Sequence, residues 1–402
     1  MQDKCSIQEL IRNHKPGWAL EQRFYTDPEI YQLELDQILL QNWFAAGHIS
    51  QIPDEGDFIV ATMDRESAIV VRGSDDSVRA FANVCRHRGS RICLSDEGSV
   101  RNFECPYHGW MYDVDGKLTA ARAMGEDFDK SAYGLKPVSL EVLGGIIFVC
   151  FSDSPPSLAS ARHDLAEPMA LFGFDKLKLA ARKSYAIAAN WKLAVENYQE
   201  CYHCATAHPE YAKMHTLMLD DAKRSRVQDA MRARFDACGI RDFNVEFINT
   251  DAPEGELGYD YSRTAMFEGY KTGSQDGEPV APLLGELRDY DGGASDFTFG
   301  PFTFVLAYSD HVVVYVFIPI DSENCECRIF WLVRDDATEG RDYDVDALTW
   351  LWDVTTRADK TIIVNNWRGV KSRFYEPGPF SKMESCESGY IDWVVRELRN
   401  TD

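Results

Sequence analysis

The amino-acid sequence predicts an α+β fold, in which a small domain of short strands is followed by a larger domain of antiparallel strands and long helices. Its 402 residues suit two or three domains rather than one. Short strand patterns separated by turns occupy residues 43–152, and longer strand patterns followed by helical ones come after residue 300. We therefore divide the chain into a helical part at 1–42, a small β domain at 43–152 and a large domain at 153–402.

The first part carries a helix signal and the small domain carries the strand signals. Asp27 followed by Pro28 is typical of a helix start, because the carboxylate caps free backbone N–H groups and proline fits the first turn. Asp115-Gly116 indicates a tight hairpin turn. Strands are expected at Phe58–Thr62, Ser67–Val71, Val78–Phe81 and Gly144–Phe151.

The large domain begins with a helical linker at 152–182 and a stretch at 183–247 that alternates strand and helix. Residues 248–300 are rich in Gly, Asp, Glu and Pro, and we interpret them as long loops that cover a site rather than core. The rest of the domain predicts strands at Phe302–Ala307, Val312–Pro319 and Cys327–Val333, and helices at 341–370 and Gly389–Arg399.

Composition excludes several classes of partner. The formal net charge of −23 makes nucleic acid an unsuitable ligand, because binding it requires Lys and Arg to displace counterions. The longest apolar runs are strand-length, and the N-terminus has no apolar secretory segment. Eleven scattered cysteines cannot all pair within one chain. We therefore expect no membrane segment and a reducing, cytoplasmic location.

Two short arms carry the first group of metal-ligand residues. Cys85-x-His87 and Cys105-x-x-His108 supply two thiolates and two imidazoles, and a glycine follows each arm directly or after one residue. This donor set closes a tetrahedral zinc site, or it holds a Rieske [2Fe–2S] cluster with both Cys on one iron and both His on the other. The glycines favour the cluster, because bulky bridging sulfides need close backbone approach. A zinc finger more often has its two Cys on one arm.

A second group lies in the segment from Glu196 to Pro209. His203 and His208 are five residues apart, which on a regular helix is about 140° of rotation and places them on different faces. Pro209 pushes His208 out of the helical region, so both imidazoles are able to converge on one metal. A Cys pair at positions 201 and 204 also suggests redox chemistry, but the histidines already account for the segment.

A site with two histidines needs a third ligand, usually a carboxylate. Asp359 on the predicted late helix is the best-placed acid, and Asp353 is the fallback. Glu200 stands three residues before His203, where its carboxylate reaches the same side of a helix. The alternative is that these histidines are ordinary helix residues and that Asp359 pairs with Lys or Arg.

The two groups together resemble the large (α) subunit of the Rieske non-haem iron oxygenases over nearly the whole chain. Cys-x-His-x17-Cys-x-x-His followed by Gly-Trp matches the cluster motif, and Glu-Asn-Tyr-x-Glu-x-x-His-x4-His-Pro matches the mononuclear iron motif. The sequence departs from the family after Asp359, where Val364 and Trp367 stand in places that often hold Glu and Gln. The resemblance implies a Rieske β-domain inserted near the start of a helix-grip catalytic domain.

The resemblance also implies the cofactors and the role of each residue. Cys85, His87, Cys105 and His108 would hold a Rieske [2Fe–2S] cluster, and His203, His208 and Asp359 would hold a mononuclear Fe(II). Glu200 would bridge to His108 of a neighbouring subunit in a homotrimer, while Asn197 and Tyr198 would line or support the site. An NAD(P)H-dependent flavin/iron–sulfur reductase would supply electrons for O2 activation, in monooxygenase or dioxygenase chemistry. Arg86, Arg88 and Arg91 either dock that reductase or brace the cluster loop.

The substrate is the least determined feature. N-demethylation of a small quaternary ammonium compound such as a betaine is favoured by Glu200, because most ring-hydroxylating members have Asp there, and by the supply of aromatic residues for a cation cage. The cage candidates are Tyr259, Tyr261, Phe267, Tyr270, Phe304, Tyr308 and Tyr315. Hydroxylation of an aromatic ring or aromatic acid is the alternative. A non-catalytic electron carrier and a zinc-stabilised binding protein are the alternatives of a different class.

Overall fold

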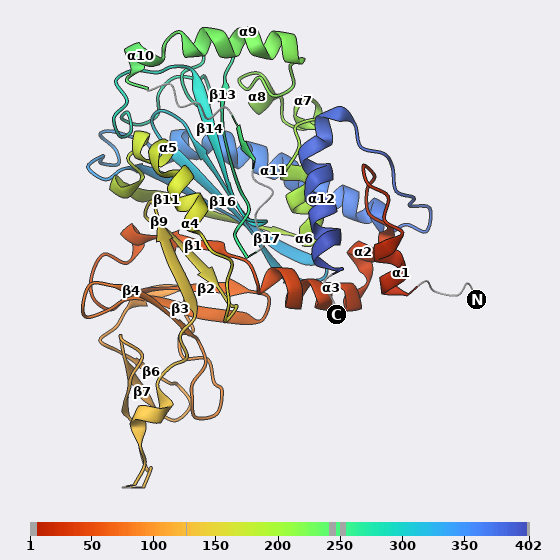
Figure 1. The fold of residues 1–402 in the computed structure, drawn as a ribbon. Coiled ribbons are helices and arrows are strands. Elements are labelled where there is room, and N and C mark those ends of the chain that lie inside the picture. Colours follow the sequence, from red (N-terminus) through yellow and green to blue (C-terminus); the bar gives the residue numbers. More distant parts are fainter. Residues whose placement is uncertain (1–5, 126, 241–246, 250–254, 400–402) are drawn as a thin grey trace.

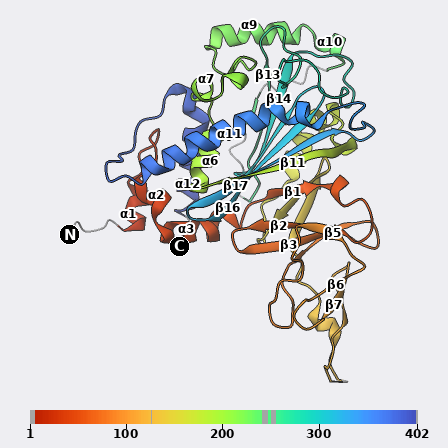
Figure 2. The same cartoon turned by 180° about the vertical axis from the view of Figure 1, so that it is seen from behind.

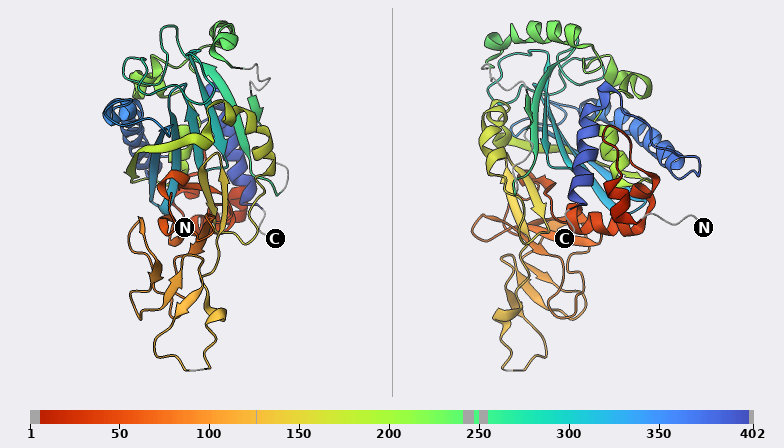
Figure 3. Two further views of the ribbon diagram at one scale, coloured as in Figure 1. Left: turned by 90° about the vertical axis from the view of Figure 1, so that its left-hand side faces the viewer. Right: turned by 45° about the vertical axis from the view of Figure 1, so that its right-hand side comes forward.

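The computed structural model describes residues 6–125, 127–240, 247–249 and 255–399. The small domain, coloured orange to yellow, projects from one end of the large domain, which contains the long central sheet (Figure 1). Two further views show the same projection from the side (Figure 3). The α+β class and the order of the domains are confirmed, and Cys5 together with part of the predicted loop, 250–254, lies outside the described residues.

Three small antiparallel sheets build the small domain. It has its own hydrophobic core, which includes Phe58, Phe81 and Trp110. The predicted strands are confirmed, and Asp115-Gly116 turns the chain from β7 into β8. The first sheet has the order β1 (Phe44–His48), β10 (Ile146–Cys150) and β9 (Ser139–Leu143). The second has the order β4 (Val78–Ala82), β3 (Glu66–Arg72), β2 (Asp57–Met63) and β5 (Glu97–Ser99). The third has the order β6 (Asn102–Glu104), β7 (Met111–Asp113) and β8 (Leu118–Ala120).

Seven antiparallel strands form the sheet of the large domain. The order is β11 (Leu177–Ile187), β17 (Asn324–Arg334), β16 (Val312–Asp321), β15 (Thr303–Ala307), β14 (Gly293–Phe299), β13 (Tyr259–Ala265) and β12 (Phe247–Asn249). The stretch at 183–247 therefore differs from the prediction, because β11 ends at Ile187 and only helices follow until β12 within the described residues.

Most helices belong to the large domain. Asp27 caps α3 through its carboxylate, which accepts the N–H of Glu29 at 3.1 Å, as the Asp-Pro signal predicts. The described helices are α1 (Ile7–Arg12), α2 (Gln22–Thr26), α3 (Pro28–Glu34), α4 (Ala159–Asp164), α5 (Ala166–Leu171), α6 (Trp191–Tyr198), α7 (Cys204–Ala207), α8 (Pro209–Ala212), α9 (Asp221–Arg232), α10 (Phe235–Cys238), α11 (Val345–Val370) and α12 (Ser385–Glu397). None of the described helices is long and apolar enough to cross a membrane.

The long helix α11 lies across one face of the large sheet, which we call the inner face (Figure 2). Tyr185 of β11 donates a hydrogen bond of 2.6 Å to Asp353 of α11. On the same face, Tyr198 at the end of α6 stacks on Phe304 with ring centroids 4.3 Å apart. The opposite, outer face packs on the small domain, where Phe299 meets Phe148 at 5.2 Å. A sheet with one long helix across it is the helix-grip arrangement.

The stretch at 248–300 corrects one prediction. Residues 259–265 and 293–299 are not covering loops but strands β13 and β14, and Tyr261 and Phe297 on their outer face are buried core residues. The opposite positions carry polar side chains such as Ser262 and Asp296. Those polar positions face the inner side of the sheet rather than the core. They give the two strands a composition that is typical of loops.

A buried ion pair anchors α6 to the N-terminal helices. Lys192 Nζ lies 2.6 Å from Glu34 Oε1, both side chains are 0% exposed, and Trp191 donates a second hydrogen bond to Glu34 at 2.9 Å. Burial raises the pKa of Glu34, while Lys192 lowers it. Breaking such a pair leaves a charge without a partner in the core.

Lys192→Met is therefore expected to lower the free energy of unfolding by about 3–5 kcal/mol. Replacing Arg162, whose partner Glu141 is exposed, is expected to cost at most about 1 kcal/mol because water screens that pair. Chemical denaturation of both variants measures the difference. An equal loss of unfolding free energy in the two variants would show that the buried pair stabilises the protein no more than the exposed one.

Candidate metal centres

Two similar loops at the tip of the small domain carry the Cys/His arms. In each loop the glycine N–H returns to the carbonyl of the cysteine, from Gly89 to Cys85 at 3.0 Å and from Gly109 to Cys105 at 2.9 Å. Both glycines have positive φ, 76° and 68°, a conformation that other residues rarely adopt. The two loops therefore have the same turn, and each presents one cysteine and one histidine.

The donor atoms of the two arms gather at one place. His87 Nδ1 and His108 Nδ1 are 3.2 Å apart, and Cys85 and Cys105 are buried beneath them. Tyr112 supports the sulfur side, because its hydroxyl lies 3.4 Å from Cys85 Sγ and accepts the N–H of Arg86 at 3.0 Å. Burial raises the pKa of Cys85, so that a bound cation is needed to hold it as a thiolate. Two sulfurs on one side and two imidazole nitrogens on the other fit a Rieske cluster.

The second group forms where the chain changes direction twice. Helix α6 ends at Tyr198, α7 covers only Cys204–Ala207, and His208 has a non-helical conformation with φ −144° and ψ 78°. The break before Pro209 turns both imidazoles toward each other, as the sequence predicts, and His203 Nε2 lies 3.0 Å from His208 Nε2. Glu200 lies in the turn between α6 and α7, so the prediction that it shares a helix with His203 is wrong.

Asp359 joins the two histidines from the middle of α11. Its Oδ1 lies 3.3 Å from His203 Nε2 and 3.0 Å from His208 Nε2. Ligand atoms about 2.1 Å from one metal ion at right angles to one another are about 3 Å apart, so the three atoms fit one shared ion. His208 Nδ1 is buried without a hydrogen-bond partner among the described residues. The fallback, Asp353, is engaged elsewhere by Tyr185 and Arg357.

Electrostatics also favour a cation at this place. Burial alone lowers the pKa of His203, but the carboxylates of Asp359 and Glu200 raise it to about 9. Burial raises the pKa of Asp359, and the two histidines bring it below its ordinary value. The carboxylates thus hold positive charge between them, either a proton on His203 or a metal ion.

Comparison with known proteins matches both domains. The family described as "Ring hydroxylating alpha subunit (catalytic domain)" matches residues 174–400, and "Rieske [2Fe-2S] domain" matches residues 42–140. The glycine betaine monooxygenase oxygenase subunit of Pseudomonas aeruginosa PAO1 is 34% identical over 395 residues, 98% of this chain and 92% of that protein. The chain belongs to the Rieske oxygenase α subunits.

Two more distant comparisons agree with this membership. The carnitine monooxygenase oxygenase subunit of Escherichia coli K12 is 27% identical over 98% of this chain and 95% of that protein. A crystal structure of the quaternary ammonium Rieske monooxygenase CntA with an inhibitor has the same fold, with a TM-score of 0.75 at 23% identity, covering 98% of this chain and 99% of that one. The protein is thus an oxidoreductase of the family that uses a Rieske [2Fe–2S] cluster and a mononuclear iron, not a zinc-stabilised binding protein or a bare electron carrier.

Two of the three further predicted site residues contact His203 in this Rieske oxygenase. Glu200 Oε1 lies 2.5 Å from His203 Nδ1, and its other oxygen accepts the backbone N–H of Tyr202. The Asn197 amide nitrogen lies 3.4 Å from His203 Nε2. Tyr198 instead points to the sheet and stacks on Phe304. Glu200 therefore contacts one candidate ligand directly, and Tyr198 contributes to the wall beside it.

The cysteine pair between the two histidines forms a disulfide, Cys201–Cys204, which the sequence interpretation set aside. The Cys204 sulfur lies within 4.8 Å of a nitrogen of both His203 and His208. Because that sulfur is bonded to Cys201, it offers no thiolate to a metal. Asp359 is thus the better third ligand.

The aromatic residues proposed for a cation cage divide between the two faces of the sheet. Phe304 stacks on Tyr198, Tyr315 meets Trp352 and Tyr308 hydrogen-bonds His215. In contrast, Tyr259 hydrogen-bonds Asp164 and Tyr261 packs on Phe297 in the core. The prediction is wrong for the latter two residues, because they point to the outer face. Phe267 and Tyr270 follow β13 in a loop.

Sequence reasoning missed two aromatic residues beside the candidate ligands. Tyr211 lies 5.5 Å from the His208 ring and 5.4 Å from Trp352. Trp352 also meets Tyr315 at 5.4 Å. Their spacing from the candidate ligands could have indicated them. Trp352 precedes Asp359 by two helical turns and Tyr211 follows His208 by one turn, so each lies on the same side of the chain as its ligand.

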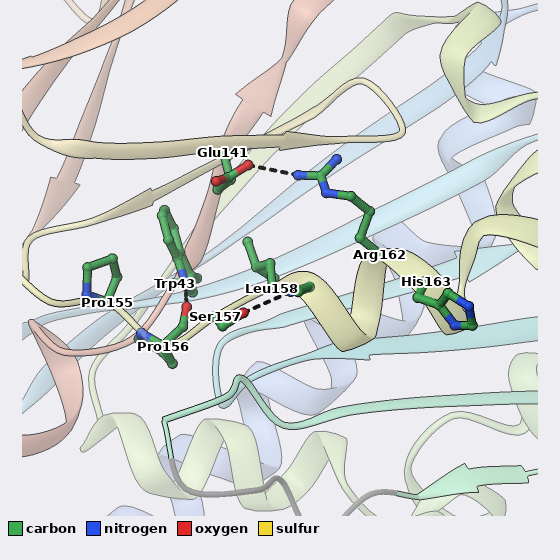
Figure 4. Close-up of a pocket in the computed structure, with 9 residues that line it drawn as sticks. Trp43, Glu141, Pro155, Pro156, Ser157, Leu158, Arg162 and His163 are labelled. Carbon is green, nitrogen blue, oxygen red and sulfur yellow. Dashed lines mark hydrogen bonds and ion pairs between the residues drawn. The ribbon is translucent and has the colours of Figure 1, made fainter.

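The arginines of the cluster loop and one surface hollow are the remaining surface features of the oxygenase. Arg88 stacks over Tyr107 at 5.2 Å, and Arg91 hydrogen-bonds the carbonyl of Arg65 at 3.1 Å, so part of the arginine group braces loops. The hollow in Figure 4 lies where the two domains meet, between Trp43 and the Glu141–Arg162 pair, and shares no residue with either centre.

Proposed function

We propose that this protein is the oxygenase component of a two-component monooxygenase that N-demethylates a small quaternary ammonium compound of the betaine type. The observation that carries the proposal is the 34% identity with a glycine betaine monooxygenase oxygenase subunit over 98% of the chain. The site agrees with it, because Tyr198, Phe304 and Tyr315 form an aromatic wall beside the candidate iron ligands. Such a wall suits a cation that has no hydrogen to donate.

The proposed reaction hydroxylates one N-methyl group. A methyl C–H bond is replaced by C–OH, and the C–N bond then breaks with its electron pair staying on nitrogen. The hydroxyl proton passes to the nitrogen, which releases formaldehyde and a protonated tertiary amine. One O2, two electrons and two protons are consumed, and one water forms. The cluster, when bound, supplies electrons one at a time, and the mononuclear iron supplies the site of O2 activation.

The protein side chains would bind the two groups and orient them. Cys85 and Cys105 would hold one iron of the cluster, and His87 and His108 the other. His203, His208 and Asp359 would hold the mononuclear iron from one side, leaving other positions for O2 and water. Glu200 would accept the Nδ1 proton of His203 and so fix the ring with Nε2 toward the metal.

We further propose two kinds of partner. An NAD(P)H-dependent flavin/iron–sulfur reductase would deliver the electrons to the exposed tip of the small domain. The oxygenase would work as a homotrimer, in which His108 of one subunit approaches Glu200 of the next. The small domain projects away from the large one, which suits contact with a neighbour (Figure 1).

A substrate panel tests the proposed function. The purified oxygenase with a reductase is expected to release formaldehyde from glycine betaine or a related betaine, with one formaldehyde for each O2 consumed. Aromatic acids serve as the comparison, with product detected by chromatography. Turnover of aromatic acids with no formaldehyde from any betaine would refute the assignment and support ring hydroxylation.

A further inference from the structure

One carboxylate on the inner face of the sheet, that of Asp296, belongs to neither metal centre. Asp296 lies on β14, directly opposite Leu306 of β15 and Ser262 of β13. Two positions further, Thr298 is opposite Phe304, which stacks on Tyr198. Directly opposed residues in an antiparallel pair point to the same face, and so do residues two apart on one strand. Asp296 therefore points to the same side as the aromatic wall.

The carboxylate of Asp296 has no hydrogen-bond or ion-pair partner among the described residues, although it is half-buried. The cation whose charge acts on it, Arg263, lies on the outer face and is held by Asp291 through two hydrogen bonds of 2.9 and 2.6 Å. Burial raises the pKa of Asp296 to about 7. A buried carboxylate without a partner is costly, and it is retained where a ligand supplies the missing charge.

The carboxylates of Asp296 and of the candidate iron ligand Asp359 act on the same two tyrosines. The negative charges of both carboxylates raise the pKa of Tyr198 and of Tyr211, after the larger effect of burial. The charge of Asp296 also reaches Tyr308, whose hydroxyl hydrogen-bonds His215 at 2.9 Å. Tyr198 and Tyr211 thus lie within electrostatic reach of both the candidate iron ligand and the unpaired carboxylate.

We propose that Asp296 is the counter-ion that binds the cationic head of the substrate and selects it against uncharged compounds of the same shape. The inference rests on the proposed function for the identity of the cation. A trimethylammonium group donates no hydrogen bond, so it needs a negative charge and aromatic faces rather than oriented acceptors. Asp296 supplies the charge, and the side chains of Tyr198, Tyr211 and Tyr308 supply the faces.

Asp296→Asn tests the role while conserving the shape of the side chain. Calorimetry on the metal-loaded protein is expected to show that the Kd of glycine betaine rises roughly 10- to 100-fold in this variant. The Kd of 3,3-dimethylbutanoate, which has carbon in place of the charged nitrogen, is expected to stay the same or fall. Asp296→Glu, which keeps the charge, is expected to recover part of the affinity for betaine.

Asp260→Asn is the matched control, because Asp260 lies on the same face of the neighbouring strand, opposite Thr298. Its betaine affinity is expected to equal that of the unmodified protein. Equal betaine Kd values in Asp296→Asn and Asp260→Asn, or no betaine binding by the unmodified protein, would overturn the role of Asp296. Betaine that binds through Asp296 but is never oxidised would refute the proposed reaction and leave the counter-ion assignment standing.

Discussion

Asp359→Ala is expected to remove the mononuclear iron and leave the [2Fe–2S] cluster intact. Its Oδ1 is one of three atoms that lie within 3.3 Å of one another, and alanine offers no replacement for it. Activity is expected to fall by more than the roughly 10- to 100-fold that follows loss of a hydrogen bond to a metal ligand. Iron analysis and the visible spectrum of the cluster measure the two centres separately.

Asp353→Ala is the control for this variant, because Asp353 lies on the same helix but binds Tyr185, Lys183 and Arg357 instead. It is expected to keep both centres. Loss of the mononuclear iron from Asp353→Ala, with iron retained in Asp359→Ala, would show that the third ligand is wrongly assigned.

Cys105→Ser is expected to have the opposite effect, loss of the cluster with the mononuclear iron retained. Cys105 is buried beside Cys85, and a serine hydroxyl does not replace a thiolate on iron. Reductase-supported turnover is expected to disappear, since electrons no longer enter. Visible absorption and electron paramagnetic resonance follow the cluster.

Cys93→Ser is a matched control for Cys105→Ser. Cys93 is a free cysteine in the same domain, where burial raises the pKa of its thiol to about 12 and keeps it protonated. The variant is expected to retain the cluster spectrum. A cluster that survives in Cys105→Ser would contradict the ligand assignment of the two arms.

The ligand groups were predictable because their chemistry is contained in short segments. The two arms carry their own turns, set by Gly89 and Gly109, and Pro209 marks the end of the short helix between His203 and His208. Asp359 could also be predicted as a ligand, because a single long helix fixes its place. In these segments local backbone rules decide the geometry, and sequence reasoning applies directly.

The wall of the site was not predictable in the same way. Tyr261 and Tyr308 look alike in the sequence, but only the strand register shows that the first points to the outer face. Asp296 could not be predicted as a site residue for the same reason, because the composition of its strand is typical of a loop. Which face of a strand lines a site depends on pairing across the sheet, and pairing partners here lie far apart in the chain.

A single-turnover experiment tests the central claim, that both centres act together on a betaine. The oxygenase is loaded with iron, reduced chemically at both centres, freed of reductant and mixed with glycine betaine and O2. The two stored electrons suffice for one hydroxylation. About one formaldehyde per active site is therefore expected without any reductase. Full reoxidation of both centres with no formaldehyde, and with betaine recovered unchanged, would contradict it.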